Sequence, residues 1–267
     1  MNMLLPIICI ALYGLCTVLL WRNINAPGDQ NQTGGIYLAA TAAVVLHAAG
    51  LYRDMNIPGE TLISLGSAVS TAGWISALLY LLLSLRIRII ELGLIVFPIS
   101  ILAALAGILA TGSAVPLSNF PANVQVHILL AIPTYGILFT AFAQACLLVA
   151  QDRQLRKGVG GRISTLPPIQ SMESYLFFLI VCGFALMTLN LALGMFSHGL
   201  KYGRMLEFNH HVVFSLAAWI SFGTIIAGRY VMGWRGEIAA KWTIAAFSLL
   251  VLAYFGTRFV NELILIQ

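Results

Sequence analysis

Residues 207–236 read EFNHHVVFSLAAWISFGTIIAGRYVMGWRG, an apolar run long enough to cross a membrane with polar residues at both ends. Adjacent histidines, His210 and His211, open the run, and Arg229 and Arg235 close it. Imidazole is the commonest metal-ligating side chain and also binds haem iron. The histidine pair is therefore a candidate ligand site, and the other spans are expected to form the scaffold around it.

The composition predicts an integral membrane protein. Charged residues make up 9% of the 267 residues and apolar residues 60%, with a mean hydropathy of +0.93. A soluble domain carries about 25% charged residues, whereas this chain has room for about eight spans of roughly 20 residues. The net charge of +5 comes from basic residues scattered at the ends of apolar runs, which argues against a nucleic-acid partner.

Eight apolar runs have membrane-spanning length, and each is expected to be a helix. Within lipid a segment must satisfy its own backbone hydrogen bonds, and these runs are about twice as long as a barrel strand. The expected class is an all-α integral membrane protein, a bundle of about eight transmembrane helices forming one domain over residues 1–267. The expected spans are residues 3–21, 35–52, 62–85, 90–111, 126–150, 172–196, 210–232 and 242–263.

Basic residues predict the orientation, because Lys and Arg are enriched in cytoplasmic loops. With the N-terminus outside, ten of the 14 basic residues face inwards and four face outwards. Both termini are therefore expected outside, which in a bacterium means the periplasm. The inner set is Arg22, Arg86, Arg88, Arg153, Arg156, Lys157, Arg162, Arg229, Arg235 and Lys241, and the outer set is Arg53, Lys201, Arg204 and Arg258.

This orientation places all five histidines in the outer half of the membrane. His127 opens the fifth span and is followed at helical spacing by Pro133 and Tyr135, a pattern that suggests a haem ligand beside a kinked helix or, alternatively, an ordinary interfacial histidine. His47, flanked by small residues, is either a functional group within the membrane or a neutral imidazole bonded to a neighbouring helix. His198 lies among turn residues and is expected to be solvated.

His210 and His211 differ by about 100° around a helix, so both point into one pocket only if the helix starts between them. Either could pair with His127 at the same depth. The uncharged loop of residues 111–126 leads directly into His127. It is expected to be either a lid lying on the membrane surface or a simple connector.

Other chemistries find little support. The chain has no HExxH, GxSxG, Walker or dinucleotide motif, so nothing indicates a hydrolase or nucleotide enzyme. Arg258 and Glu262, four residues apart, are expected to pair with each other, and the alternative is that Arg258 meets a haem propionate. The cysteines lie inside apolar runs without a C-x-x-C, which excludes a c-type cytochrome and argues against a thiol–disulfide carrier. They are Cys9, Cys16, Cys146 and Cys182.

Over residues 126–260 the order of features resembles the cytochrome c assembly family. The matching pieces are HILLAIPTYGILFTAFAQACLLVAQ from His127, LPPIQSMESYLFFLIVCGFALMTLNLALG from Leu166, and AAW followed by GWRG and AYFG. Earlier pieces, VLHAAGLYR and IELGLIVFPIS, are similar to its short, HemX-like subgroup, and the family-like region spans about residues 60–263.

The resemblance implies a multi-span protein that handles haem at its outer face. It implies a non-covalent, b-type haem held by His127 and His210, with His47 and His211 as further candidates. Implied partners are proteins of cytochrome c maturation or haem synthesis, together with membrane lipids.

The chain departs from the family where a tryptophan-rich WWD loop should precede AAW. It has MLEFNHHVVFSL there, with Phe208 and Asn209 in place of the Trp-Asp, and His210 can replace the missing second ligand. These differences argue against synthase activity, so a haem carrier or regulator is expected. A haem-free transporter and a structural subunit of a membrane complex are the alternatives.

Overall fold

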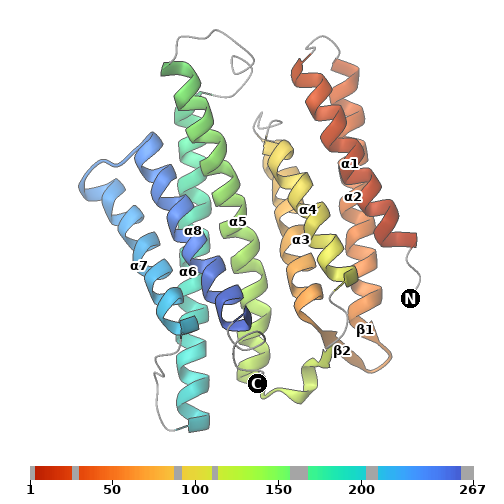
Figure 1. Ribbon diagram of the computed structural model, residues 1–267, viewed down its shortest axis with the longest axis vertical. Coiled ribbons are helices and arrows are strands. Elements are labelled where there is room, and N and C mark those ends of the chain that lie inside the picture. The colour runs from red at the N-terminus through yellow and green to blue at the C-terminus, as the bar shows by residue number, and fades with distance from the viewer. Residues whose placement is uncertain are drawn as a thin grey trace.

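The computed structural model is an up-and-down helical bundle (Figure 1). It describes residues 4–25, 30–86, 92–109, 114–156, 168–202 and 210–259. The expected all-α membrane bundle is confirmed, with a helix on each expected span. The helices are α1 Leu4–Asn25, α2 Gln30–Met55, α3 Leu65–Ser84, α4 Gly93–Leu109, α5 Ala122–Arg156, α6 Ile169–Tyr202, α7 His210–Val231 and α8 Gly236–Phe259.

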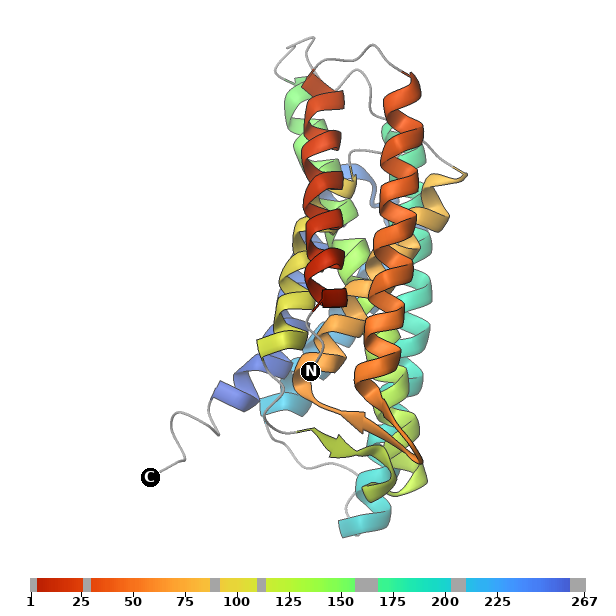
Figure 2. The same ribbon diagram turned by 90° about the vertical axis from the view of Figure 1, so that its right-hand side faces the viewer.

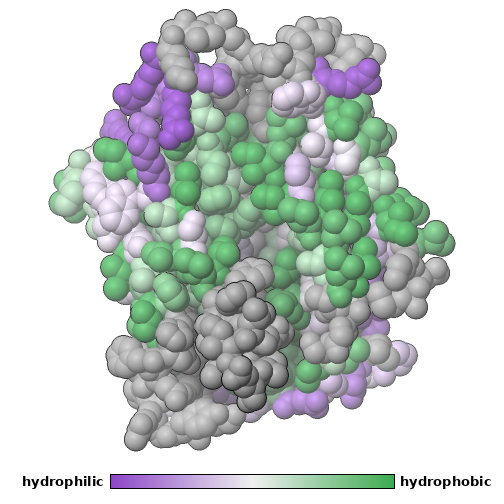
Figure 3. Space-filling view, viewed as in Figure 1, coloured by the Kyte–Doolittle hydropathy of each residue, from purple (hydrophilic) through white to green (hydrophobic). Residues whose placement is uncertain are grey.

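The helices have the length and surface of membrane spans. Seven of them are long and apolar enough to cross a bilayer, and the eighth, α4, is apolar and 17 residues long. Apolar side chains cover the middle of the face seen in Figure 3, while hydrophilic ones gather toward its ends. This banding is expected where a bundle meets lipid in the middle and headgroups or water at the ends.

Three short strands accompany the helices and were not expected from the sequence. Strands β1 (Asn56–Ile57) and β2 (Glu60–Ile63) form a hairpin around Gly59, whose φ of 89° suits glycine. Strand β3 (Val115–Pro116) pairs with β2 and continues into the 3-10 helix η2 (Leu117–Asn119). Strands this short show no alternation in the sequence. They lie at one end of the bundle (Figure 2), which we name the strand end.

Two helices run well beyond the expected spans. Helix α5 begins at Ala122 and ends at Arg156, and α6 covers Ile169–Tyr202. Hydropathy locates the apolar part of a helix, but the backbone ladder continues into polar turns that face headgroups or water. The loop expected over residues 111–126 is therefore shorter, because residues 122–126 belong to α5. Residues 115–119 of this segment form β3 and η2.

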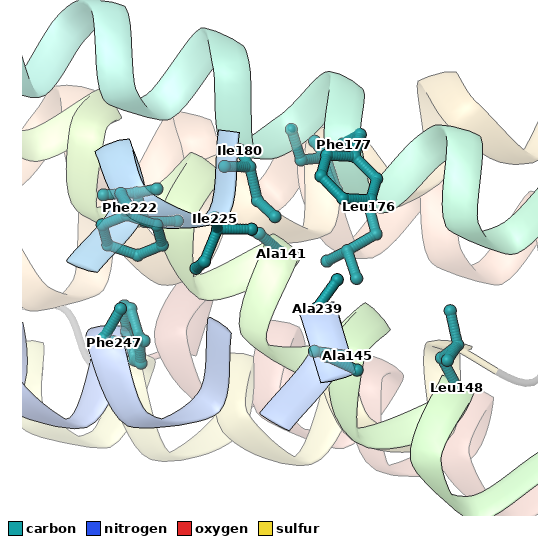
Figure 4. Packing of buried hydrophobic residues seen from close by; sticks show 14 of the residues in the cluster. Ala141, Ala145, Leu148, Leu176, Phe177, Ile180, Phe222, Ile225, Ala239 and Phe247 are labelled. Carbon is teal, nitrogen blue, oxygen red and sulfur yellow. The ribbon is translucent and has the colours of Figure 1, made fainter. Parts of the chain in front are cut away.

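Buried residues form two clusters, one in each half of the chain. The first joins α1–α4, with Ala143 of α5, around Phe97, whose ring contacts those of Tyr13 and Tyr80. The second joins α5–α8, and Figure 4 shows side chains of all four helices meeting, among them Phe222 and Phe247. Helices α3 and α4 pack very closely, because a Cβ on Gly73 would collide with the Cβ of Ala103.

At the end opposite the strands, an ion pair joins α6, α7 and α8. Glu173 is 7% exposed, and its Oε1 lies 2.6 Å from Arg229 Nη1 while its Oε2 accepts a hydrogen bond from Gly236 N (3.2 Å). The Arg229 guanidinium lies 3.8 Å from the centre of the Phe177 ring. Gly233 and Gly236 turn the chain between α7 and α8 with φ of 66° and 55°. We name these contacts the Glu173 junction.

Candidate cofactor site

A large cavity lies between the two halves of the bundle. Its volume is about 610 Å³, within the range of roughly 300–1,000 Å³ that small-molecule and cofactor sites occupy. Helices α3 and α4 contribute only small and aliphatic side chains to the wall apart from Ser64 at the start of α3, whereas α5, α6 and α7 contribute most of the polar ones. None of the described lining residues is Asp, Glu, Lys or Arg.

The cavity becomes more apolar away from the strand end. The polar side chains of Ser64 and His127 line it toward the strands, and Ser64 caps α3 by accepting a hydrogen bond from the backbone of Ser67. Farther along the helices, Phe139 and Phe247 contribute aromatic rings. A ligand with an apolar body and a polar edge fits this gradient, with its polar edge toward the strand end.

His127 lines the cavity in the second turn of α5. Its Nδ1 lies 3.1 Å from the backbone oxygen of Asn190 on α6. A carbonyl oxygen only accepts hydrogen bonds, so Nδ1 carries the proton and Nε2 keeps its lone pair. Gly194, one turn after Asn190, allows the ring this position, because a Cβ there would lie 3.2 Å from His127 Cε1. The main chain of α6 thus orients the imidazole as a metal-ligating histidine requires.

The expected neighbours of His127 share its cavity. Tyr135 lines the same wall, and its hydroxyl donates a 3.5 Å hydrogen bond to the backbone oxygen of Leu250 on α8. Pro133 stands between Thr134 and Ile132, which both line the cavity, and a proline at this point removes one hydrogen bond from the helical ladder.

The adjacent histidine pair begins α7, as the sequence suggested. The side chains of His198, His210 and His211 lie outside the described residues. Ser215 of α7 lines the cavity. His211 precedes it by four residues, a spacing that puts the two positions on one face of a helix.

His47 lies outside this cavity, in the N-terminal half. It is 5% exposed, and both ring nitrogens have partners: Tyr13 Oη lies 3.3 Å from Nδ1 and Ser70 Oγ lies 2.9 Å from Nε2. A separate cavity of about 50 Å³ borders it. Helix α3 separates the two spaces, since Ser70 contacts His47 while Val69 lines the large cavity.

Several cavity-lining residues were not predicted from the sequence, among them two polar ones inside spans. Asn190 and Ser215 are polar residues inside apolar spans, and both line the cavity. The rule that polar groups within a membrane are expensive could have marked Asn190 for attention. The expected pair of Arg258 and Glu262 lies outside the described side chains.

These features define a class: a polytopic membrane protein with an apolar, histidine-bearing cavity. Residues 62–265 match the family described as cytochrome C assembly protein. The chain belongs to the cytochrome c assembly protein family.

Three relatives agree with this assignment. The chain is 29% identical to the inner membrane protein YpjD of Escherichia coli K12 over 248 residues, 89% of this chain and 92% of that protein. An uncharacterized 28.8 kDa protein of Azospirillum brasilense is 28% identical over 53% of each chain. Protein HemX of Bacillus subtilis is 24% identical over 49% of this chain and 48% of its own. No solved structure matches. The chain is a multi-pass inner-membrane protein.

Proposed function

We propose that this protein holds haem b non-covalently in the large cavity and serves as a carrier or assembly factor in cytochrome c maturation or haem homeostasis. The observation that carries the proposal is His127, whose Nε2 lone pair is left available on an apolar cavity of about 610 Å³. The assignment of the chain to the cytochrome c assembly family supports haem as the ligand.

The described residues fit a haem. The walls of α3 and α4, with residues such as Ala72 and Gly73, offer small, apolar side chains against which a macrocycle would pack. His127 would hold the iron, and the aromatic and aliphatic walls would keep water away from it. When bound, the iron supplies the redox chemistry, while the chain binds and orients the group.

The second ligand is proposed to come from the start of α7. His210 is the position that the family resemblance favours, and His211 shares the helical face of the cavity-lining Ser215. Two histidine ligands close the coordination of the iron, which suits a carrier or regulator better than an oxygen-activating enzyme.

The absorption spectrum of purified, haem-loaded protein tests the proposal. We expect a Soret band that survives removal of free haem by gel filtration and is shifted from that of haem in detergent alone. Protein that stays colourless after loading would contradict haem binding and favour a haem-free transporter or structural subunit.

His47 is proposed to be structural. Replacing His47 by leucine should leave the Soret band of the loaded protein unchanged and lower the thermal midpoint, because the Tyr13 and Ser70 hydroxyls lose their buried partner at a cost of about 1–3 kcal/mol. His47→Gln, which retains a donor and an acceptor, is the matched control. Loss of the Soret band in a folded His47→Leu protein would show that His47 ligates the iron.

The strand end is proposed to face the periplasm. Of the described basic residues, Arg53, Lys201 and Arg258 belong to the helix ends near the strands, while seven belong to the opposite end. An excess of basic residues is typical of the cytoplasmic side of a membrane protein, so the end opposite the strands is proposed to face the cytoplasm.

Cysteine labelling in intact cells tests this orientation. Ser118 and Gln154 are exposed at opposite ends of the bundle. A membrane-impermeant maleimide should label Ser118→Cys directly and Gln154→Cys only after the inner membrane is opened. The unaltered protein measures the background from its own cysteines. Labelling of Gln154→Cys in intact cells, and of Ser118→Cys only after the inner membrane is opened, would show that the strand end faces the cytoplasm.

A further inference from the structure

Asn190 belongs to the cavity wall and bears two oxygen acceptors, of which one is used on the protein. Its backbone oxygen accepts the Nδ1 proton of His127. Its side-chain Oδ1 is buried and has no hydrogen-bond partner in the described structure, and the residue lines the cavity. Leaving a buried acceptor unpaired costs about 1–3 kcal/mol, so such an atom beside a ligand cavity points to a partner on the ligand.

Other polar side chains on the wall are already engaged. Thr134 Oγ1 donates to the Leu130 backbone oxygen (2.6 Å), and Ser64 Oγ accepts from the Ser67 backbone in the α3 cap. Asn190 therefore differs from these two residues in offering an unused acceptor at the depth of His127.

The cavity wall also restricts the charge of what Asn190 can bind. The described lining residues include no Lys or Arg to neutralise a carboxylate. A carboxyl group in apolar surroundings without a counter-ion is favoured in its protonated, neutral form. A protonated carboxyl donates through its O–H, and an amide oxygen is a matched, uncharged acceptor.

We propose that the side-chain amide of Asn190 anchors the ligand by accepting a hydrogen bond from one protonated carboxylic acid of the haem. This inference rests on the proposed function, since haem supplies both the iron for His127 and the carboxyl for Asn190. One residue of α6 would then orient the metal ligand through its main chain and fix the rotation of the macrocycle through its side chain.

Comparing haem with its dimethyl ester tests the anchor, because the ester keeps the iron and macrocycle but lacks carboxyl protons. The unaltered protein should bind the free acid about tenfold more tightly than the ester. In Asn190→Ala and the apolar near-isostere Asn190→Leu, that ratio should fall to about one through weaker binding of the acid. These variants retain the backbone oxygen that holds His127. Ser248→Ala is the control and should keep the ratio, because Ser248 is exposed outside the cavity and bonds the backbone oxygen of Ile244 as Thr134 bonds that of Leu130.

The outcomes separate the two proposals. If the unaltered protein binds neither compound, haem binding fails and the anchor fails with it. If it binds both but Asn190→Ala and Asn190→Leu leave the ratio unchanged, or lose acid and ester affinity equally, haem binding stands and the anchor is overturned.

Discussion

Replacing His127 by alanine is expected to lower the affinity for haem at least about tenfold, equivalent to about 1.4 kcal/mol of binding free energy, and to change the Soret band that remains. The proposed iron ligand is Nε2, since Nδ1 is bonded to the Asn190 backbone oxygen. The other described polar side chains on the wall are hydroxyls and an amide, which are weaker ligands for haem iron. Titration of the purified variant with haem measures the loss.

Exogenous imidazole distinguishes a lost ligand from a damaged fold. In His127→Ala the removed ring leaves space beside Gly194, and added imidazole should restore the spectrum of the unaltered protein. Thr134→Val, on the same wall of α5, is the control and should retain both affinity and spectrum. A His127→Ala protein that binds haem with unchanged affinity and spectrum would remove His127 from the site.

The second ligand can be identified by the same titration. Alanine at the true ligand in α7 should convert a six-coordinate, low-spin spectrum to a five-coordinate one, while alanine at its neighbour should not. Because His211 lies four residues before the cavity-lining Ser215, helical geometry favours a spectral change in His211→Ala. The family resemblance instead favours a spectral change in His210→Ala.

The membrane spans were predictable from the sequence, because a helix that crosses a bilayer needs a run of about 20 mostly apolar residues. Eight apolar runs became eight helices, since the cost of unpaired backbone groups in lipid leaves few other structures. The strands escaped because Val115–Pro116 is too short for alternation, and its pairing with β2 joins segments about 50 residues apart. Such pairing depends on tertiary packing that a local pattern does not contain.

The candidate site was predictable in part. His127 was identified because an imidazole at the head of a span is rare and chemically useful, and the structure places it on a large cavity. The partners of His47 were not predictable, because Tyr13 and Ser70 reach it from two other helices. The contact of Asn190 with His127 was not predictable either, because it is made by a backbone oxygen, which every residue type has.

The sequence segments that resemble the family lie at both ends of the bundle. HILLAIPTYG brings His127 and Tyr135 to the cavity, whereas MES and GWRG meet far from it in the Glu173 junction. Glu173 belongs to the first of these distant pieces, and Gly236 ends the second. A packing role for the junction therefore accounts for these two pieces without involving haem.

Replacing Glu173 by alanine is expected to destabilise the protein by about 2–4 kcal/mol, somewhat less than the 3–5 kcal/mol typical of breaking a fully buried ion pair. The change leaves Arg229 on Phe177 without its counter-ion and removes the acceptor for Gly236 N at the start of α8. The Arg229 side chain stays 29% exposed, so solvent offsets part of the loss. For a chain of this size the thermal midpoint in detergent should fall by roughly 5–15 °C.

Two further variants show whether the ion pair itself is responsible. Glu237→Gln alters a partly exposed carboxylate that pairs with the exposed side chains of Lys241 and Arg156. It should leave the midpoint near that of the unaltered protein, because pairs at the surface contribute little. Arg229→Met combined with Glu173→Ala should cost less than the sum of the single changes, since the double variant buries no unpaired charge. Additive losses, or a Glu173→Ala midpoint equal to that of Glu237→Gln, would mean that α6, α7 and α8 are held together by their apolar contacts alone.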